Sequence, residues 1–383
     1  MKIRTKDLQA MVSKVQRGSV ANGIAPITGL INISKGADGS FVVRTFDGFC
    51  HYRAKSLDQS YGEDSFTASV NANLFVNLVA KTTSEEVELK FEGSSLTFEG
   101  NGSYKIEVVY DGGVPLDFPS LSSYFDGVTE THALNLKELG EAFSACDVTM
   151  VKNVADFPMY SAMNVAERCV ATDNNTACIH TGQVIDSGSV RIPYPALKVI
   201  QSFSDAEVEI GVTDDPENPR FHMSDSSFDV CGALAKNHRK FPASVLEGLM
   251  SVKCPKVAIK VDEALGAIDR ALLFSKQSDE RGIFLSFADG VIGVTCIKDT
   301  KKTNALSEEI DAYEVGADGN PTDSAACIAE PFEAPLDIYY LQSQLRALKT
   351  KMAVIGFGMS KYITVSGGND VYMLSFLALK GVK

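Results

Sequence analysis

The chain has 383 residues, too many for one ordinary hydrophobic core and suited to two or three domains. With 45% hydrophobic and 22% charged residues it is typical of a folded globular protein, and no apolar run is long enough to cross a bilayer. The net charge of -13 is opposite to the basic balance of most nucleic-acid binders, so any surface of that kind must concentrate its positive charge locally.

The N-terminal residues 1–6 are charged and lack the apolar core of a signal peptide, so we expect a cytoplasmic protein. The eight cysteines are dispersed and form no CxxC motif. This pattern predicts buried free thiols in a reducing compartment, without a zinc site or a redox pair.

The first part of the chain predicts a helix followed by strands and a second helix. Leu8, Met11, Val12 and Val15 have the spacing of one helix face, which predicts a helix over 3–17. The elements expected after it are a strand (39–44), a strand leading into a helix (66–70 and 71–83), two paired strands (87–91 and 96–99) and a closing strand (104–109).

The same order recurs twice. The second copy opens with a helix over 135–147, in which Asn135 and Glu138 fit a capping box, and the third with a helix over 261–276. The second copy continues with strand 163–171, strand 190–192 into helix 193–203, paired strands 208–212 and 220–223, and strand 227–234. The third continues with strand 283–295, strand 335–338 into helix 339–351, paired strands 353–357 and 362–365, and strand 371–377.

The spacing between the copies is nearly constant. The strands reach Thr45, Thr172 and Thr295, with steps of 127 and 123 residues, and the Phe-Pro pairs at Phe118 and Phe241 are 123 apart. Proline cannot donate to a strand ladder, so such a pair is a natural exit from a sheet edge. We therefore predict three α+β domains, 1–123, 124–252 and 253–383, each with two helices packed on antiparallel sheets.

Motifs of enzymes and cofactor sites are missing from the sequence, which has no P-loop, GxSxG, HExxH or dinucleotide-binding pattern. Asp47 and Asp173 occupy the same place in two copies, which favours a structural turn over a catalytic pair. The histidines lack metal-ligand spacing, and we expect surface or turn positions for them: His51, His132, His180, His222 and His238. No catalytic residue, metal or cofactor is predicted.

The ordered set of segments resembles the bacterial DNA polymerase III beta subunit, a DNA sliding clamp, over essentially the whole chain. The closest local matches are Ala171-Thr172-Asp173, Arg191-Ile192-Pro193, Asp117-Phe118-Pro119 and Lys240-Phe241-Pro242. The resemblance implies the clamp fold: two subunits of three similar domains pair head to tail as a homodimer. The resulting ring of six domains, lined by twelve helices, encircles duplex DNA and tethers the replicative polymerase for processivity.

Charge on the six expected helices fits this resemblance. They hold twelve Lys and Arg against seven Asp and Glu, a net charge of +5, within a chain whose total is -13. Lysine and arginine side chains of this kind contact phosphates, which gives DNA binding that is independent of sequence and sensitive to salt. For each residue taken alone, the alternative to a DNA contact is an ordinary solvated helix face. The candidates are Lys14, Arg17, Lys81, Lys198, Arg270, Lys276, Arg346, Lys349 and Lys351.

The resemblance also implies an apolar cleft for short peptides of polymerases and clamp-loader subunits. By position its walls are Thr172, Asn174, Asn175, Ala177, Pro242, Val245, Leu246, Met373, Leu374, Phe376 and Leu377. The family commonly has Gly, an aromatic or His, Arg and Leu after the Thr-Asp pair, and a Met-Pro-Met-basic pattern near the C-terminus. Neither pattern is present here, so the preferred peptide is expected to differ, as in a phage-encoded or otherwise divergent clamp.

The subunit interface is expected at an edge strand of the first domain and a helix end of the third. The matching residues are Tyr104, Ile106, Val108, Leu272, Leu273 and Phe274. Because Leu272 and Leu273 are adjacent, they cannot share one narrow helix stripe. Two other functions stay open: an interaction scaffold that has the repeats but forms no ring, and an enzyme whose site uses distant Asp and His residues.

Overall fold

The computed structural model describes residues 1–20, 25–56, 61, 64–213, 215–236, 238–275, 282–288, 290–296, 306–327, 332–358 and 361–377. Within these ranges, no helix has the length and apolar character needed to cross a membrane.

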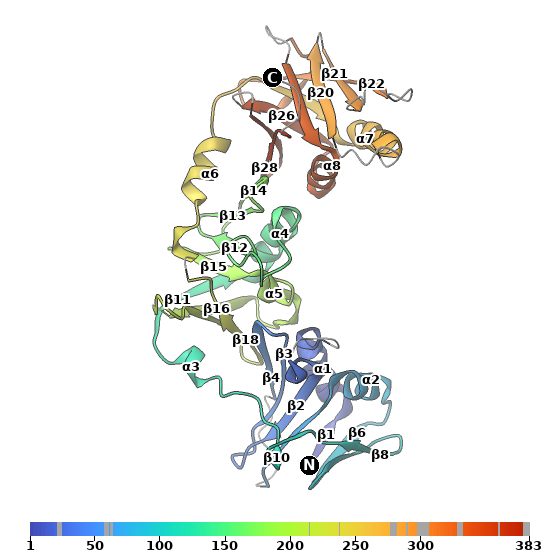
Figure 1. Ribbon diagram of the computed structural model, residues 1–383, viewed down its shortest axis with the longest axis vertical. Coiled ribbons are helices and arrows are strands. Elements are labelled where there is room, and N and C mark those ends of the chain that lie inside the picture. The colour runs from blue at the N-terminus through green and yellow to red at the C-terminus, as the bar shows by residue number, and fades with distance from the viewer. Residues whose placement is uncertain are drawn as a thin grey trace. The chain divides into compact units, whose positions relative to one another are not determined.

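One order of elements occurs three times in the described residues (Figure 1). The first copy comprises β1 (Lys2–Arg4), α1 (Thr5–Val15), β2 (Leu30–Lys35), β3 (Phe41–Phe46), β4 (Cys50–Lys55), β5 (Phe66–Asn71), α2 (Ala72–Lys81), β6 (Glu86–Glu92), β7 (Ser95–Glu99) and β8 (Ser103–Glu107). The second comprises β11 (Val128–Asn135), α4 (Leu136–Cys146), β12 (Ala162–Val165), β13 (Arg168–Thr172), β14 (Thr176–Thr181), β15 (Val190–Pro193), α5 (Tyr194–Leu197), β16 (Glu207–Thr213), β17 (Arg220–Ser224) and β18 (Phe228–Ala233).

The third copy carries one additional hairpin. It comprises β19 (Lys256–Lys260), α7 (Val261–Ser275), β20 (Gly282–Ala288), β21 (Val291–Cys296), β22 (Ser307–Asp311), the added β23 (Tyr313–Val315) and β24 (Pro321–Ala325), then β25 (Phe332–Asp337), α8 (Ile338–Ala347), β26 (Met352–Gly358), β27 (Tyr362–Gly367) and β28 (Asp370–Ser375). The connections between copies hold β9 (Tyr110–Asp111), β10 (Val114–Pro115), α3 (Ser122–Phe125) and α6 (Ala243–Met250). Short 3-10 turns occur at Gln16–Gly18, Pro26–Gly29, Asp147–Thr149, Ile200–Ser202 and His238–Lys240.

Four predicted elements differ from the structure. The helix expected over 339–351 ends at Ala347, because Leu348 is extended, so Lys349 and Lys351 follow the helix rather than belong to it. The single strands expected over 163–171 and 283–295 are hairpins, β12–β13 and β20–β21. Gly290, with φ of 83°, permits the tight turn of the second hairpin. The helix expected over 193–203 ends at Leu197, because Val199 has φ of -107° and ψ of 12° and interrupts the helical backbone.

The described chain divides into two compact units. Unit 1 is Met1–Gly140 with Ile185–His238, and unit 2 is Glu141–Val184 with Arg239–Lys383. Each unit contains a sheet that joins two consecutive copies of the repeat. The three domains predicted from the sequence stay a prediction, because this division follows the joins between copies rather than the copies themselves.

Pairing of the closing strand with a strand of the preceding copy makes each join. In unit 1 the strand order is β11-β16-β17-β18-β4-β3-β2-β5, with β18 beside β4. In unit 2 the corresponding run is β12-β13-β14-β28-β27-β26-β19-β23-β24, with β28 beside β14. These antiparallel pairs cover sheet edges that would otherwise expose unpaired backbone groups.

Helices pack in pairs within each unit. The stripe predicted on the first helix is confirmed, because Leu8, Met11, Val12 and Val15 are all buried. The Gln9 amide of α1 donates to two backbone carbonyls at the end of α2, both at 3.0 Å. In unit 2, α7 lies against α8 in the same way. The remaining strands of the first and third copies form four-stranded sheets, β1-β6-β7-β8 and β22-β21-β20-β25.

Candidate functional site

A tight turn between β13 and β14 begins the candidate groove in unit 2. Asp173 Oδ1 accepts hydrogen bonds from the backbone N–H groups of Asn175 at 2.9 Å and Thr176 at 2.7 Å. The hydroxyl of Thr172 donates to the Thr176 carbonyl and accepts from the Asn174 N–H. Asn174 has φ of 77°, a left-handed conformation that asparagine tolerates better than most residues.

Unit 1 contains the same turn between β3 and β4. Asp47 Oδ1 accepts from the N–H groups of Phe49 at 2.8 Å and Cys50 at 2.7 Å, and Gly48 takes the left-handed conformation. The turn role predicted for Asp47 and Asp173 is therefore confirmed. The two turns correspond through these aspartates, so the alignment of Thr45 with Thr172 was one residue out of register.

β14, α6 and β28 meet next to the turn of unit 2. The predicted groove residues Ala177, Leu246 and Met373 belong to one buried apolar cluster. Its other buried members are Val170, Ile179 and Tyr362, with Phe241, Ala243 and Met250 packed against it. The Tyr362 hydroxyl donates to the Leu249 carbonyl at 2.7 Å and so holds the end of α6. Sequence reasoning missed Val170, Ile179 and Tyr362, because β13, β14 and β27 are buried on both faces and show no alternation that would assign a side chain to one of them.

Exposed groups border this cluster. Val245 and Leu249, four residues apart on α6, are 59% and 37% exposed, which is high for large apolar side chains. Asn174 and Asn175 are exposed at the turn, whereas Thr172 and Leu374 are buried. Pro242, Phe376 and Leu377 are half-buried. The cluster therefore has an apolar edge on α6 and a polar edge at the turn.

Tyr340 adds a further polar group to the turn. Burial of the Tyr340 hydroxyl raises its pKa, and the negative charge of the Asp173 carboxylate raises it further. The hydroxyl hydrogen-bonds to Asp173. Such a residue was not predicted, because α8 is far from the turn in sequence. It adds a hydroxyl to the polar edge of the cluster at the turn.

The basic residues predicted on the helices of unit 1 differ in their surroundings. Lys14 is half-buried, and its ammonium donates to the hydroxyls of Ser204 at 2.7 Å and Ser227 at 2.6 Å. Arg17 is exposed and donates to the Lys198 carbonyl at 2.9 Å. The exposed members of this group are Arg17, Lys81 and Lys198. Lys14 thus ties α1 to the second copy of the repeat.

In unit 2, Arg270 pairs with Glu308, and their hydrogen bonds raise the pKa of Arg270 and lower that of Glu308. Arg346 lies 3.1 Å from Asp269. Lys349 and Lys351 are exposed beyond the end of α8 and form no ion pair within the described part of the chain. Lys276 lies outside the described residues.

Two of the predicted interface residues are well exposed, Tyr104 at 42% and Leu273 at 61%. Phe274 is half-buried, and Ile106, Val108 and Leu272 are buried within their own units. Tyr104 lies on β8, at the edge of the sheet β1-β6-β7-β8. The adjacent leucines on α7 thus face in different directions, one into the core and one outward.

No group of three or more His, Cys, Asp or Glu that could hold a metal occurs among the described residues. The expected surface positions of the histidines are wrong for His51 and His180, which are 6% and 4% exposed. His180 Nδ1 lies 2.6 Å from Asp370 Oδ1, an intramolecular pair between β14 and β28. His132, His222 and His238 are half-buried.

Comparison with protein-family models and with curated proteins finds no match. Solved structures do match over the full length. A sliding clamp from Pseudomonas aeruginosa is 14% identical with a TM-score of 0.79, covering 99% of both chains. The DNA polymerase III beta subunit of Thermotoga maritima is 12% identical with a TM-score of 0.77, and the beta chain from Streptococcus pneumoniae is 15% identical with a TM-score of 0.78, each covering 99% of both chains. The chain has the α+β fold of these sliding clamps, which confirms the predicted resemblance for the fold.

Proposed function

We propose that this protein is a non-enzymatic DNA sliding clamp, a cytoplasmic homodimer that closes into a ring around duplex DNA and tethers the replicative polymerase. The observation that carries the proposal is the full-length match to sliding clamps, in which 99% of this chain and 99% of the other chain correspond. A match of that extent includes all three copies of the repeat.

The distribution of charge supports passage of DNA. The exposed Lys81 ends α2, and the exposed Lys349 and Lys351 directly follow α8; neither helix contains an acidic residue. Contacts between such ammonium groups and phosphates do not depend on base sequence. Loose contacts of this kind suit a ring that slides, because closure of the ring retains the DNA.

Ring formation is tested by native mass and negative-stain electron microscopy of the purified chain and of Leu273→Asp. We expect dimers with an open centre for the unsubstituted chain and monomers for the variant, because the new carboxylate would be desolvated in the interface. The matched control is Val245→Asp, since Val245 is exposed to a similar degree on α6. Monomeric particles without an open centre in the unsubstituted chain would refute the ring and favour a scaffold.

DNA passage is tested on a nicked plasmid after loading. We expect the ring to stay bound to the circular plasmid through a high-salt wash and to be released when the plasmid is linearised. Equal retention on circular and linear DNA would contradict topological binding. Lys349→Glu with Lys351→Glu should reduce loading more at low salt than at high salt, because screening weakens phosphate contacts.

We further propose that the apolar cluster with its exposed α6 edge receives short peptides of polymerases and clamp-loader subunits. The exposed Val245 and Leu249 beside buried Leu246 give a surface for apolar anchors of a peptide. Titration with a panel of labelled hexapeptides that carry two adjacent large apolar residues tests this. Val245→Asp should abolish binding while Leu273→Asp leaves it intact, and the opposite pattern would refute the site.

A further inference from the structure

We infer that the sheet face of unit 1 that corresponds to the candidate peptide site binds an acidic, aromatic segment, and that the chain supplies this segment itself. The occupant is the connector, defined here as Asp117–Phe125, which includes α3. Because all contacts involved lie within unit 1, the inference holds whether or not the chain forms a ring.

The two units share the framework of the groove. The strand run β3-β4-β18-β17 of unit 1 has the same antiparallel order as β13-β14-β28-β27 of unit 2. Both runs begin with the aspartate turn, at Asp47 and at Asp173. In both units a Phe-Pro pair leads toward a short helix, α3 or α6. Each unit therefore presents a corresponding sheet face beside a corresponding helix.

Strand register identifies the corresponding positions. Cys231 pairs with His51 in unit 1, as Met373 pairs with Ala177 in unit 2. Continuing along the pairs places Arg44 where unit 2 has Val170, Arg53 where it has Ile179, and Arg220 where it has Tyr362. The face that is apolar in unit 2 is therefore basic in unit 1, and an apolar peptide segment would not fit it.

Aromatic side chains of the connector cover this basic face. The Tyr124 ring lies 5.1 Å from the Arg220 guanidinium and packs edge-on against His51, with ring centroids 5.6 Å apart. The Phe125 ring lies 5.3 Å from the Arg53 guanidinium, and its centroid is 4.5 Å from that of His222. A guanidinium positioned over an aromatic ring is stabilised by cation–π attraction.

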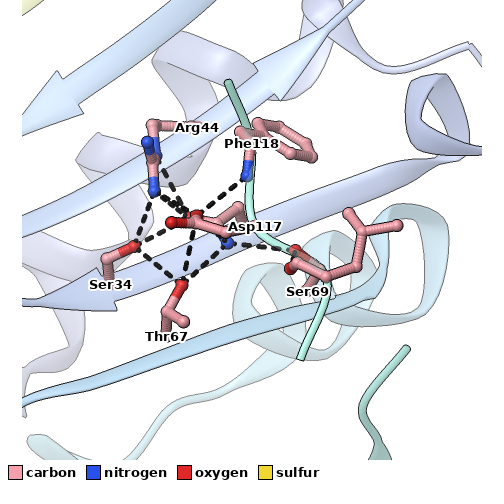
Figure 2. Close-up of polar contacts among 8 residues, drawn as sticks. Ser34, Arg44, Thr67, Ser69, Asp117 and Phe118 are labelled. Atoms are coloured by element: carbon pink, nitrogen blue, oxygen red, sulfur yellow. Dashed lines mark hydrogen bonds and ion pairs between the residues drawn. The ribbon is translucent and has the colours of Figure 1, made fainter. Parts of the chain in front are cut away.

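A network of hydrogen bonds to the Asp117 carboxylate holds the start of the connector (Figure 2). Asp117 Oδ1 accepts from Arg44 at 2.7 Å and from Asn32 and Thr67 at 3.3 Å each. The same oxygen accepts the backbone N–H of Phe118 at 2.8 Å, and the Phe118 ring is buried. Asp117 and two aromatic rings of the connector thus meet the three arginines of the face, where Arg53 also pairs with Asp229 of β18.

The contrast with α6 shows what the connector does. In unit 2 Leu246 of α6 is buried in the apolar cluster and Val245 and Leu249 stay exposed, whereas in unit 1 Tyr124 and Phe125 are half-buried against the arginines. The segment after the Phe-Pro pair therefore meets its sheet through apolar contacts in unit 2 and through cation–π contacts in unit 1. A connector displaced from the face would uncover a site for an acidic, aromatic peptide.

A peptide of residues 117–127 supplied in trans tests the inference by fluorescence anisotropy. The opened variant combines Tyr124→Ala and Phe125→Ala, and its matched control combines Leu74→Ala and Phe157→Ala, two exposed apolar side chains that belong to no proposed site. We expect the peptide to bind the opened variant at least tenfold more tightly than it binds the unsubstituted chain or the control. A peptide with both aromatic residues replaced by alanine should not bind.

Equal binding to the opened variant and the unsubstituted chain, or no binding to a folded opened variant, would overturn the inference. Hydrogen exchange of the unsubstituted chain keeps it testable if the variant does not fold. The amides of residues 121–127 should exchange at least tenfold more slowly in the chain than in the free peptide. Equal exchange rates would also overturn it.

Discussion

Replacement of Asp229 by alanine is expected to destabilise unit 1 strongly, although the residue belongs to no predicted site. Its side chain on β18 is 2% exposed and accepts from Arg53 Nε at 2.7 Å and from Lys55 Nζ at 3.1 Å. Arg53 and Lys55 lie on β4, so this carboxylate bridges the join between the first and second copies of the repeat.

The expected loss of stability follows from the ion-pair contacts that Arg53 and Lys55 lose in the variant. Breaking a buried ion pair costs about 3 to 5 kcal/mol when the remaining charge stays buried and unpaired. Here the Arg53 and Lys55 side chains are 27% and 32% exposed, so water replaces part of the lost interaction. We therefore expect the free energy of unfolding to fall by about 2 to 3 kcal/mol for Asp229→Ala, and by less for Asp229→Asn, which keeps one acceptor oxygen.

Urea unfolding followed by circular dichroism measures the loss, with Glu92→Ala as an exposed control on β6. A double-mutant cycle with Arg53→Ala isolates the pair. A loss below about 0.5 kcal/mol, the usual range of surface substitutions, would refute the reasoning. So would equal costs of Arg53→Ala in the presence and absence of Asp229.

Three further predictions concern unit 1 and the shared turn. Gly18→Ala should lower stability by about 2 to 3 kcal/mol in thermal unfolding, because its Cβ would lie 2.1 Å from the buried Tyr52 ring; an unchanged melting temperature would contradict this. Asp47→Ala and Asp173→Ala should each cost about 1 to 3 kcal/mol, since each leaves two turn N–H groups without their acceptor; a variant as stable as the unsubstituted chain would show that the turn forms without it. Burial of the His51 imidazole, with a smaller contribution from a nearby guanidinium, lowers its pKa from 6.5 to about 4. The unfolded state therefore takes up the proton at a higher pH than the folded state. The free energy of unfolding should decrease as the pH is lowered from 6.5 to about 4, by at most about 3 kcal/mol. His51→Gln should remove this part of the pH dependence of melting, and an identical pH profile would disprove the assignment.

The order of elements could be predicted from the sequence, because it depends on local spacing. Leu8, Met11, Val12 and Val15 recur at helical intervals, and the structure buries all four. The capping role of Asn135 is likewise local: its side chain accepts the N–H of Glu138 at 3.1 Å. Near-constant steps between copies made the repeat, and with it the clamp resemblance, recognisable without any close relative in sequence.

Strand pairing between distant segments was decided only by the tertiary structure. Helical spacing marks Leu272, four residues after the buried Ile268, as the inward leucine of α7, but only the structure shows what packs against it; Leu272 is 7% and Leu273 61% exposed. The basic face of unit 1 likewise combines residues from β3, β4 and β17 that come together only through the register of β18 on β4. Such pairing depends on the summed burial of whole sheet faces, whereas a sequence pattern records only the preference of each strand for one side.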